Sequence, residues 1–242
     1  MVIAIGPFFF LKGLFIYTQI KQFNDKCNKI EKMKNGIIFD LDGTLWDARA
    51  SLLESYNLTM QKHNLHYRFD FDTVTSYMGL TPLETVKLAF KDVSTDIGMK
   101  YFSYLVKEEI EFLKIKPGII YPSELEVLSS LSKKYDLFIV SNCEKGYIET
   151  YLEGCNTKDY FKDHLCIGDT KKEKWENILI VKGKYNIENV IYVGDTKKDF
   201  IESSKAKVKF IHASYGFGVI EEKVNKINNL LELDSEIDKL TI

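Results

Sequence analysis

The sequence predicts an α/β protein: a parallel sheet covered by helices on both faces, with a block of helices inserted after the first strand. Short apolar runs at residues 37–39, 137–140 and 190–193 each end in polar residues, as strands buried on both faces of a sheet do. Helical segments alternate with these runs in the second half of the chain. Residues 47–113 show apolar residues at helical spacing and no alternating strand pattern, which predicts the helical insertion.

The first strand is followed directly by Asp40-Leu41-Asp42-Gly43-Thr44. In an open parallel sheet, ligands bind at the carboxyl ends of the strands. Gly43 lets the chain turn there, so Asp40 and Asp42 are both expected to face one cleft. Two carboxylates in one cleft repel each other unless a cation lies between them or one holds a proton. The pair therefore predicts a site for Mg²⁺, which takes oxygen ligands, or for a nucleophile and a general acid.

The inserted block is predicted to be an α-helical domain over residues 48–114. Asp47 can cap its first helix. Thr81 and Glu84 form a capping box around Pro82, which predicts the start of another helix. Just before that helix, Gly79 permits an unusual backbone conformation.

The chain returns to the sheet at Pro117-Gly118, so the core domain is predicted to comprise residues 35–47 and 115–242. Ser123 and Glu126 predict a second capping box. The remaining strands are expected at residues 137–140, 165–167, 190–193 and 208–212. Helices are expected at residues 147–153, 175–185 and 198–206, with a terminal helix at residues 220–233.

Polar residues at two more strand ends complete a recognisable order of motifs. Ser141-Asn142 follows the run at residues 137–140, and Gly194-Asp195 follows the run at residues 190–193. Lys174 lies between these motifs. In this order they resemble the four motifs of the haloacid dehalogenase (HAD) superfamily of phosphotransferases. The resemblance implies a Rossmann-like core with an α-helical cap that closes over the active site, and phosphoglycolate phosphatase-like proteins are the group that the chain is most similar to.

The resemblance assigns roles to the first motif. Asp40 would be the nucleophile that forms an aspartyl-phosphate and would also bind Mg²⁺. Asp42 would be the general acid and base, with its backbone carbonyl as a metal ligand. Because the dehalogenases of this superfamily lack an Asp at this position, Asp42 favours phosphate chemistry. Thr44 would orient the loop by hydrogen bonding and belong to the phosphate-binding residues.

The later motifs would complete the site. By resemblance, Ser141 would hydrogen-bond a phosphate oxygen, with Asn142 beside it in the phosphate-binding set. Asp195 would bind Mg²⁺ directly, and Asp199 would bind it directly or through water, since Mg²⁺ keeps several waters.

The active-site lysine has three candidates, Lys171, Lys172 and Lys174. The role requires a fixed cation beside the nucleophile and the phosphate, at the start of the helix after the strand at residues 165–167. Similar family members carry Lys-x-Glu-Asn-Ile at this motif, and Lys174 begins that pattern here. We therefore predict Lys174, as a catalytic and phosphate-binding residue, and expect the other two to be solvated loop charges.

The metal-binding motif has a near copy earlier in the chain. Gly168-Asp169 begins a segment that nearly repeats the segment beginning at Gly194-Asp195. In the superfamily the metal pair follows the helix that bears the lysine, and only the second copy does. Asp169 is therefore predicted to lie in a loop at the mouth of the cleft.

Composition excludes some partners. The net charge of −2 gives no indication of nucleic-acid binding, and the scattered histidines show no metal-ligand spacing. The cysteines, which form no Cys-x-x-Cys pair, predict reduced thiols in a cytoplasmic protein. They are Cys27, Cys143, Cys155 and Cys166.

Residues 1–34 are predicted to lie outside this fold. Residues 2–11 are apolar, Lys12 interrupts, and the apolar run is too short to predict a transmembrane helix. Met33 precedes the first strand, so an over-long N-terminus is the preferred hypothesis and a membrane-associated helix is the alternative.

The sequence thus predicts a Mg²⁺-dependent phosphatase acting on a small phosphorylated metabolite. The same scaffold leaves open a sugar-phosphate mutase similar to β-phosphoglucomutase, a nucleotidase or a pyrophosphatase. A binding protein without catalysis is disfavoured because Asp40, Asp42, Lys174 and Asp195 are all present. The substrate and the oligomeric state are not determined by the sequence.

Overall fold

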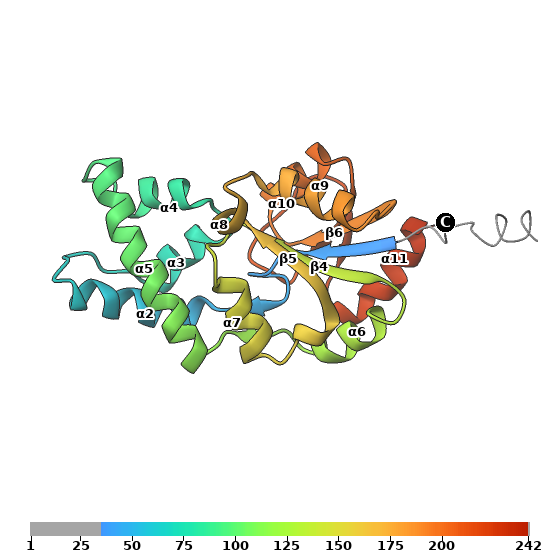
Figure 1. The fold of residues 1–242 in the computed structure, drawn as a ribbon, viewed down its shortest axis with the longest axis horizontal. Coiled ribbons are helices and arrows are strands. Elements are labelled where there is room, and N and C mark those ends of the chain that lie inside the picture. Colours follow the sequence, from blue (N-terminus) through green and yellow to red (C-terminus); the bar gives the residue numbers. More distant parts are fainter. Residues whose placement is uncertain (1–34, 242) are drawn as a thin grey trace, which may run out of the picture. The chain divides into compact units, whose positions relative to one another are not determined.

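The six-stranded main sheet is parallel throughout, with strand order β5-β4-β1-β6-β7-β8 (Figure 1). The computed structural model describes residues 35–241. The strands are β1 (Asn35–Phe39), β4 (Asp136–Ser141), β5 (Phe161–Cys166), β6 (Asn189–Gly194), β7 (Lys209–Ala213) and β8 (Asn225–Ile227). The central strand β1 pairs with β4 on one side and β6 on the other, so its carboxyl end lies between the ends of two neighbours. The predicted fold class is confirmed.

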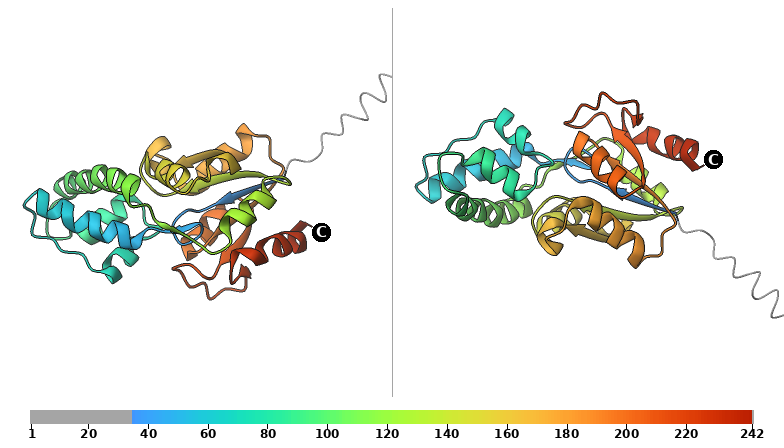
Figure 2. Two further views of the ribbon diagram at one scale, coloured as in Figure 1. Left: turned by 90° about the horizontal axis from the view of Figure 1, so that it is seen from below. Right: turned by 90° about the horizontal axis from the view of Figure 1, so that it is seen from above.

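Helices cover both faces of this sheet (Figure 2). Side chains alternate between faces along a strand: Ile37 and Phe39 belong to one apolar cluster, and Ile38 belongs to the other. The first face packs against α6 (Glu124–Leu131), α7 (Tyr147–Gly154) and α11 (Leu233–Thr241). The second face packs against α9 (Lys174–Lys184) and α10 (Lys197–Lys205). Burial on both faces explains why the central strands are continuous apolar runs.

Four helices follow the first strand, as the sequence predicts. They are α2 (Arg49–Lys62), α3 (Phe71–Tyr77), α4 (Pro82–Ala89) and α5 (Thr95–Ile115). Two short antiparallel strands, β2 (Trp46–Asp47) and β3 (Ile119–Ile120), join them to the rest of the chain. The capping box of α4 is present: Thr81 Oγ1 accepts from the Glu84 amide, and Glu84 accepts from the Thr81 amide.

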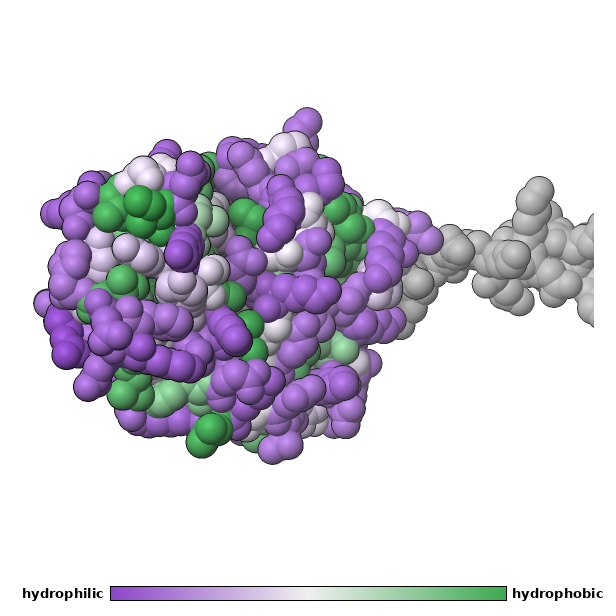
Figure 3. Space-filling view, turned by 60° about the vertical axis from the view of Figure 1, so that its left-hand side comes forward, coloured by the Kyte–Doolittle hydropathy of each residue, from purple (hydrophilic) through white to green (hydrophobic). Residues whose placement is uncertain are grey.

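The surface of these helices carries apolar side chains in separate patches between polar ones (Figure 3). Leu58, Leu83 and Leu88 are exposed examples. Apolar side chains that are scattered in this way are normal on a soluble surface, so they give no reason to infer a docking site there.

The predicted second capping box is wrong. Ser123 has a left-handed backbone (φ 64°), and its side chain makes no capping hydrogen bond. Glu124, the first residue of the helix, is buried and accepts a 2.7 Å hydrogen bond from the Tyr151 hydroxyl. A tertiary contact therefore replaces the local one that the sequence suggested.

The predicted terminal helix is misplaced. β8 occupies part of the range 220–233, a 3₁₀ turn follows at Leu230–Glu232, and α11 begins only at Leu233. β8 pairs in parallel with β7. Pairing with the free edge of the sheet thus makes this segment a strand, although the apolar residues of the segment also fit helical spacing.

The strand predicted at residues 165–167 is longer than expected, because β5 begins at Phe161. This is an edge strand whose middle carries Lys162, Asp163 and His164, so it lacks the apolar run that a central strand shows. A four-residue helix, α8 (Ile167–Thr170), follows it.

The hypotheses on residues 1–34 lie outside the described residues. Among residues 35–241, no helix is both long and apolar enough to cross a membrane.

Candidate active site

The carboxyl end of β1 carries the first predicted site residue, Asp40, which is 2% exposed. Its amide donates to the carbonyl of Val193 at the end of β6 (2.8 Å), so the sheet itself fixes its backbone. Gly43 then takes the positive φ of 78° that the turn requires, and a Cβ there would collide with the Asp195 carboxylate. The turn therefore needs glycine for both conformation and space.

A buried lysine links two of the predicted acids. Lys174 Nζ lies 3.0 Å from Asp40 Oδ1 and 2.6 Å from Asp199 Oδ1, and its side chain is 1% exposed. Burial lowers the pKa of Lys174, but the charges of Asp199 and Asp40 outweigh it, and the net direction is upward. Lys174 is therefore a fixed cation beside Asp40. Lys171 is exposed and pairs with Glu144, and Lys172 pairs with Glu176.

Three buried carboxylates meet at this edge of the sheet: Asp40, Asp195 and Asp199 each offer an oxygen within 4.8 Å of the others. Burial, and then the charges of Asp199 and Asp40, raise the pKa of Asp195 well above its usual value. Burial also raises the pKa of Asp40, to about 6, followed by the charge of Asp199. Such a cluster is stable when a cation compensates its charge.

The oxygen atoms of the cluster differ in their partners. Asp195 Oδ2 accepts from the Phe217 amide at 2.7 Å, whereas its buried Oδ1 has no hydrogen-bond partner among the described residues. Asp199 Oδ2 accepts from the Thr196 amide and hydroxyl, and its Oδ1 accepts from Lys174. The all-oxygen donor set and the unpartnered Asp195 Oδ1 fit a hard divalent cation.

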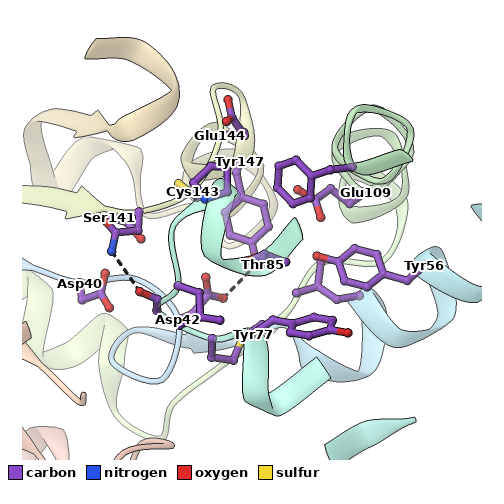
Figure 4. Close-up of a pocket in the computed structure, with 17 residues that line it drawn as sticks. Asp40, Asp42, Tyr56, Tyr77, Thr85, Glu109, Ser141, Cys143, Glu144 and Tyr147 are labelled. Carbon is purple, nitrogen blue, oxygen red and sulfur yellow. Dashed lines mark hydrogen bonds between the residues drawn. The ribbon is translucent and has the colours of Figure 1, made fainter. Parts of the chain in front are cut away.

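Asp42 lines a pocket together with Asp40 (Figure 4). Its Oδ1 accepts from Trp46 Nε1 and from the Tyr147 hydroxyl, both at 2.9 Å. Burial, and then the charge of Asp40, raise its pKa to about 7. An Asp with this pKa can hold a proton near neutral pH and release it. Its carboxylate is not among the clustered acids.

The predicted phosphate-binding residues lie at different places around Asp40. Ser141 ends β4 and lines the pocket together with Asp40. Asn142 lines it too, but its side-chain amide donates to the Gly79 carbonyl at 3.0 Å, which ties the sheet to the loop before α4. Thr44 is fully buried, and its hydroxyl has no hydrogen-bond partner among the described residues.

Residues from the inserted helices form the far side of the pocket, a cavity of about 70 Å³. In Figure 4, Asp40 and Ser141 lie on one side, and Tyr56 and Glu109 lie on the other. Gly79, with a φ of 74°, lines it in the loop that the sequence singled out.

Several functional contacts are absent from the sequence prediction. Tyr147 and Trp46 donate hydrogen bonds to Asp42, and Glu109 lines the pocket. All three lie in segments where the sequence shows only a helix or strand pattern. The Phe217 amide, which donates to Asp195, lies in the loop after β7. The near copy, predicted to lie in a loop, instead forms the short helix α8, so that part of the prediction is wrong. Asp169 accepts from Sγ of Cys166 at the end of β5 and is not part of the acid cluster.

Comparison with known proteins identifies the family. The family model described as "Haloacid dehalogenase-like hydrolase" matches residues 37–213. The chain belongs to this family. It is therefore an enzyme, a hydrolase of the HAD superfamily, and the predicted family is confirmed.

Named relatives agree with this membership. A phosphoglycolate phosphatase of Agrobacterium fabrum is 30% identical over 189 residues, covering 74% of this chain and 80% of that protein. A phosphoglycolate phosphatase of Aquifex aeolicus is 28% identical over 194 residues, covering 78% of this chain and 88% of that one. The crystal structure of a predicted phosphatase from Clostridium acetobutylicum has a TM-score of 0.73 at 22% identity, covering 86% of this chain and 100% of that chain, which supports the fold.

Proposed function

We propose that this HAD hydrolase is a Mg²⁺-dependent phosphatase that hydrolyses a small phosphorylated metabolite through an aspartyl-phosphate on Asp40. The enzyme class, a phosphoric monoester hydrolase, follows from the family and from the relatives that are named phosphoglycolate phosphatases. One observation carries the mechanism. The buried Asp40 lies 3.0 Å from a fixed lysine and belongs to an acid cluster, while Asp42 faces the same pocket.

The two carboxylates of the first motif have different roles in the proposed reaction. An oxygen of Asp40 attacks phosphorus, and the bond to the leaving alcohol breaks while Asp42 gives its proton to the alcohol oxygen. Asp42 then takes a proton from the water that attacks the aspartyl-phosphate, and inorganic phosphate leaves. The pKa of about 7 for Asp42 suits both steps, and Tyr147 and Trp46 fix its carboxylate.

The remaining residues supply charge and orientation. Lys174 offsets the negative charge of Asp40 and of the phosphoryl group. Asp40, Asp195 and Asp199 would hold Mg²⁺, with the Asp42 carbonyl as a further ligand, and Mg²⁺ would neutralise charge on the phosphate. Ser141 and Asn142 would contact phosphate oxygens, while Thr44 would stabilise the turn.

We further propose that residues 48–114 form a cap domain over a core of residues 35–47 and 115–242. The cap proposal is supported by the pocket residues that α2, α4 and α5 contribute, among them Tyr56, Thr85 and Glu109. We also propose a cytoplasmic location, which the free thiols of the three described cysteines support.

The test is phosphate release from small phosphoesters with and without Mg²⁺. The panel contains phosphoglycolate, sugar phosphates, nucleoside monophosphates and pyrophosphate. We expect Mg²⁺-dependent turnover that Asp40→Asn abolishes. Asp136→Asn is the matched control, because Asp136 lies at the opposite end of the neighbouring strand β4 and should keep full turnover. Undiminished release by Asp40→Asn would refute the mechanism.

A further inference from the structure

The far side of the pocket has an unusual charge balance for a site that binds an anion. The pocket has 17 lining residues, and none of these described residues is lysine, arginine or histidine. Four of them are acids: Asp40, Asp42, Glu109 and Glu144. Lys174 lies behind Asp40 and is held by the two carboxylates that it contacts. Lys174 thus supplies positive charge beside Asp40, whereas the described lining residues of the pocket carry none.

Glu109 is an acid on the far side of the pocket from Asp40 (Figure 4). It lies on α5, is 6% exposed and lines the pocket. Its helix neighbours Glu108 and Glu111 pair with Lys62 and Lys114 at the surface, whereas no ion pair to Glu109 occurs within residues 35–241. Its hydrogen-bond partner is the buried hydroxyl of Tyr56. Burying an acid without a cation is costly, so a partner supplied by the substrate would relieve that cost.

The raised pKa of Glu109 agrees with its burial and with the lack of an ion pair among residues 35–241. Burial raises its pKa to about 8, against the opposing hydrogen bond from Tyr56. In either state its oxygens can accept a hydrogen bond, from a hydroxyl or from an ammonium group. A carboxylate at the same place would face the acids of the pocket and would find no cation among the described lining residues, because Lys171 pairs with Glu144 from outside the lining. Like charges in a partly desolvated site repel strongly.

The pocket walls suit the same kind of group. Tyr56, Tyr77, Phe102 and Tyr147 present aromatic side chains to the cavity. Aromatic faces accept CH₂ groups and attract ammonium ions, but their negative faces disfavour anions.

We propose that this pocket selects small phosphomonoesters whose leaving group carries hydrogen-bond donors and no negative charge, and that Glu109 sets this selection. The leaving group is then a hydroxyl-bearing or amine-bearing alcohol. The proposal rests on the proposed phosphatase function and narrows its substrate class away from phosphoglycolate, the substrate in the names of the relatives.

Three phosphates of nearly equal size test the proposal: phosphoethanolamine, 2-hydroxyethyl phosphate and phosphoglycolate. They share a two-carbon leaving group that ends in ammonium, hydroxyl or carboxylate. For the native enzyme with Mg²⁺, we expect the better of the first two to exceed phosphoglycolate in kcat/KM by about tenfold or more, equivalent to about 1.4 kcal/mol. This ranking needs no variant and tests the proposal by itself.

Glu109→Gln then tests the residue. The substitution keeps the size of the side chain and leaves it unable to ionise beside an ammonium group. We expect kcat/KM for phosphoglycolate to rise and that for phosphoethanolamine to fall, so that their ratio changes about fivefold or more. Glu111→Gln, the same change on the exposed side of α5 (side chain 65% exposed), should leave the ratio as in the native enzyme.

The outcomes separate the two proposals. Preference for phosphoglycolate, or an unchanged ratio in Glu109→Gln, would overturn this inference and leave the phosphatase function standing. Mg²⁺-dependent release from none of these esters nor from the wider panel would overturn both.

Discussion

Replacing Lys174 by methionine would leave two buried carboxylates without the cation that contacts both. Lys174 Nζ lies 3.0 Å from Asp40 and 2.6 Å from Asp199, and all three side chains are at most 2% exposed. Methionine has a similar length and no charge, so the substitution removes the ion pairs with little change in packing. Lys172→Met is the matched control, since Lys172 pairs with Glu176 at 3.5 Å on the surface.

The expected magnitude follows from the burial of the pair. Breaking a buried ion pair by removing one partner costs about 3–5 kcal/mol, whereas an exposed pair such as that of Lys172 contributes about 0–1 kcal/mol. Without Lys174, the pKa values of Asp40 and Asp199 rise. Because a carboxylate with a raised folded-state pKa destabilises the fold as the pH rises through it, the loss in Lys174→Met should be largest in alkaline buffer and smaller in acid.

Urea unfolding in metal-free buffer, followed by the fluorescence of the two tryptophans, measures this difference. Phosphate release with Mg²⁺ provides the second measurement, and we expect kcat to fall about 10²–10³-fold in Lys174→Met and to stay near the native value in Lys172→Met. A stability difference between the two variants below about 1 kcal/mol, or native turnover by Lys174→Met, would refute the assignment of Lys174.

Three further predictions concern the acids. Asp195→Asn should abolish Mg²⁺-dependent phosphate release and Asp169→Asn should retain it; the reverse would overturn the choice between the two similar motifs. Excess Mg²⁺ should raise the melting temperature of the native protein, since a bound ligand stabilises the fold by about 2.7 kcal/mol at 100 times its Kd, but not that of Asp195→Asn in calorimetry. Burial raises the pKa of Glu124 from 4.5 to about 8, so its contribution is complete below about pH 4.5 and is lost as the pH rises through about 8. Urea unfolding should therefore show a smaller loss of stability between these pH values in Glu124→Gln than in the native protein, and equal losses would contradict the raised pKa.

The part of the site that the sequence predicts is the part that strand ends provide. Asp40, Ser141 and Asp195 each follow a buried strand whose continuous apolar run is easy to recognise, and parallel strands bring their carboxyl ends to one edge. The order β4-β1-β6 then places these three residues side by side. Both the fold class and this edge therefore follow from local pattern together with one topological rule.

The parts that the sequence does not predict depend on packing between distant elements. Tyr147 reaches Asp42 across 105 residues, and nothing in the pattern of α7 distinguishes that tyrosine from the buried tyrosines around it. Glu109 lies in a helix that also carries Glu108 and Glu111, and only the packing of α5 decides which of them enters the pocket. The prediction of edge strands fails for a related reason. β8 is a strand because β7 offers an unpaired edge, not because the sequence of β8 alternates between apolar and polar residues.

The two copies of the Gly-Asp-Thr-Lys-Lys motif show how far local sequence determines function here. Both copies follow a strand of the same sheet. The first follows the edge strand β5, and its residues form only the four-residue helix α8. The second follows β6, the direct neighbour of β1, where Thr196 caps the nine-residue helix α10 and Asp199 completes the capping box. That cap fixes Asp199 beside Lys174, and the position of β6 places Asp195 beside Asp40. The chemistry of the second copy thus arises from its place in the strand order. The first copy follows β5, which β4 separates from β1, so the same residues there cannot reach Asp40.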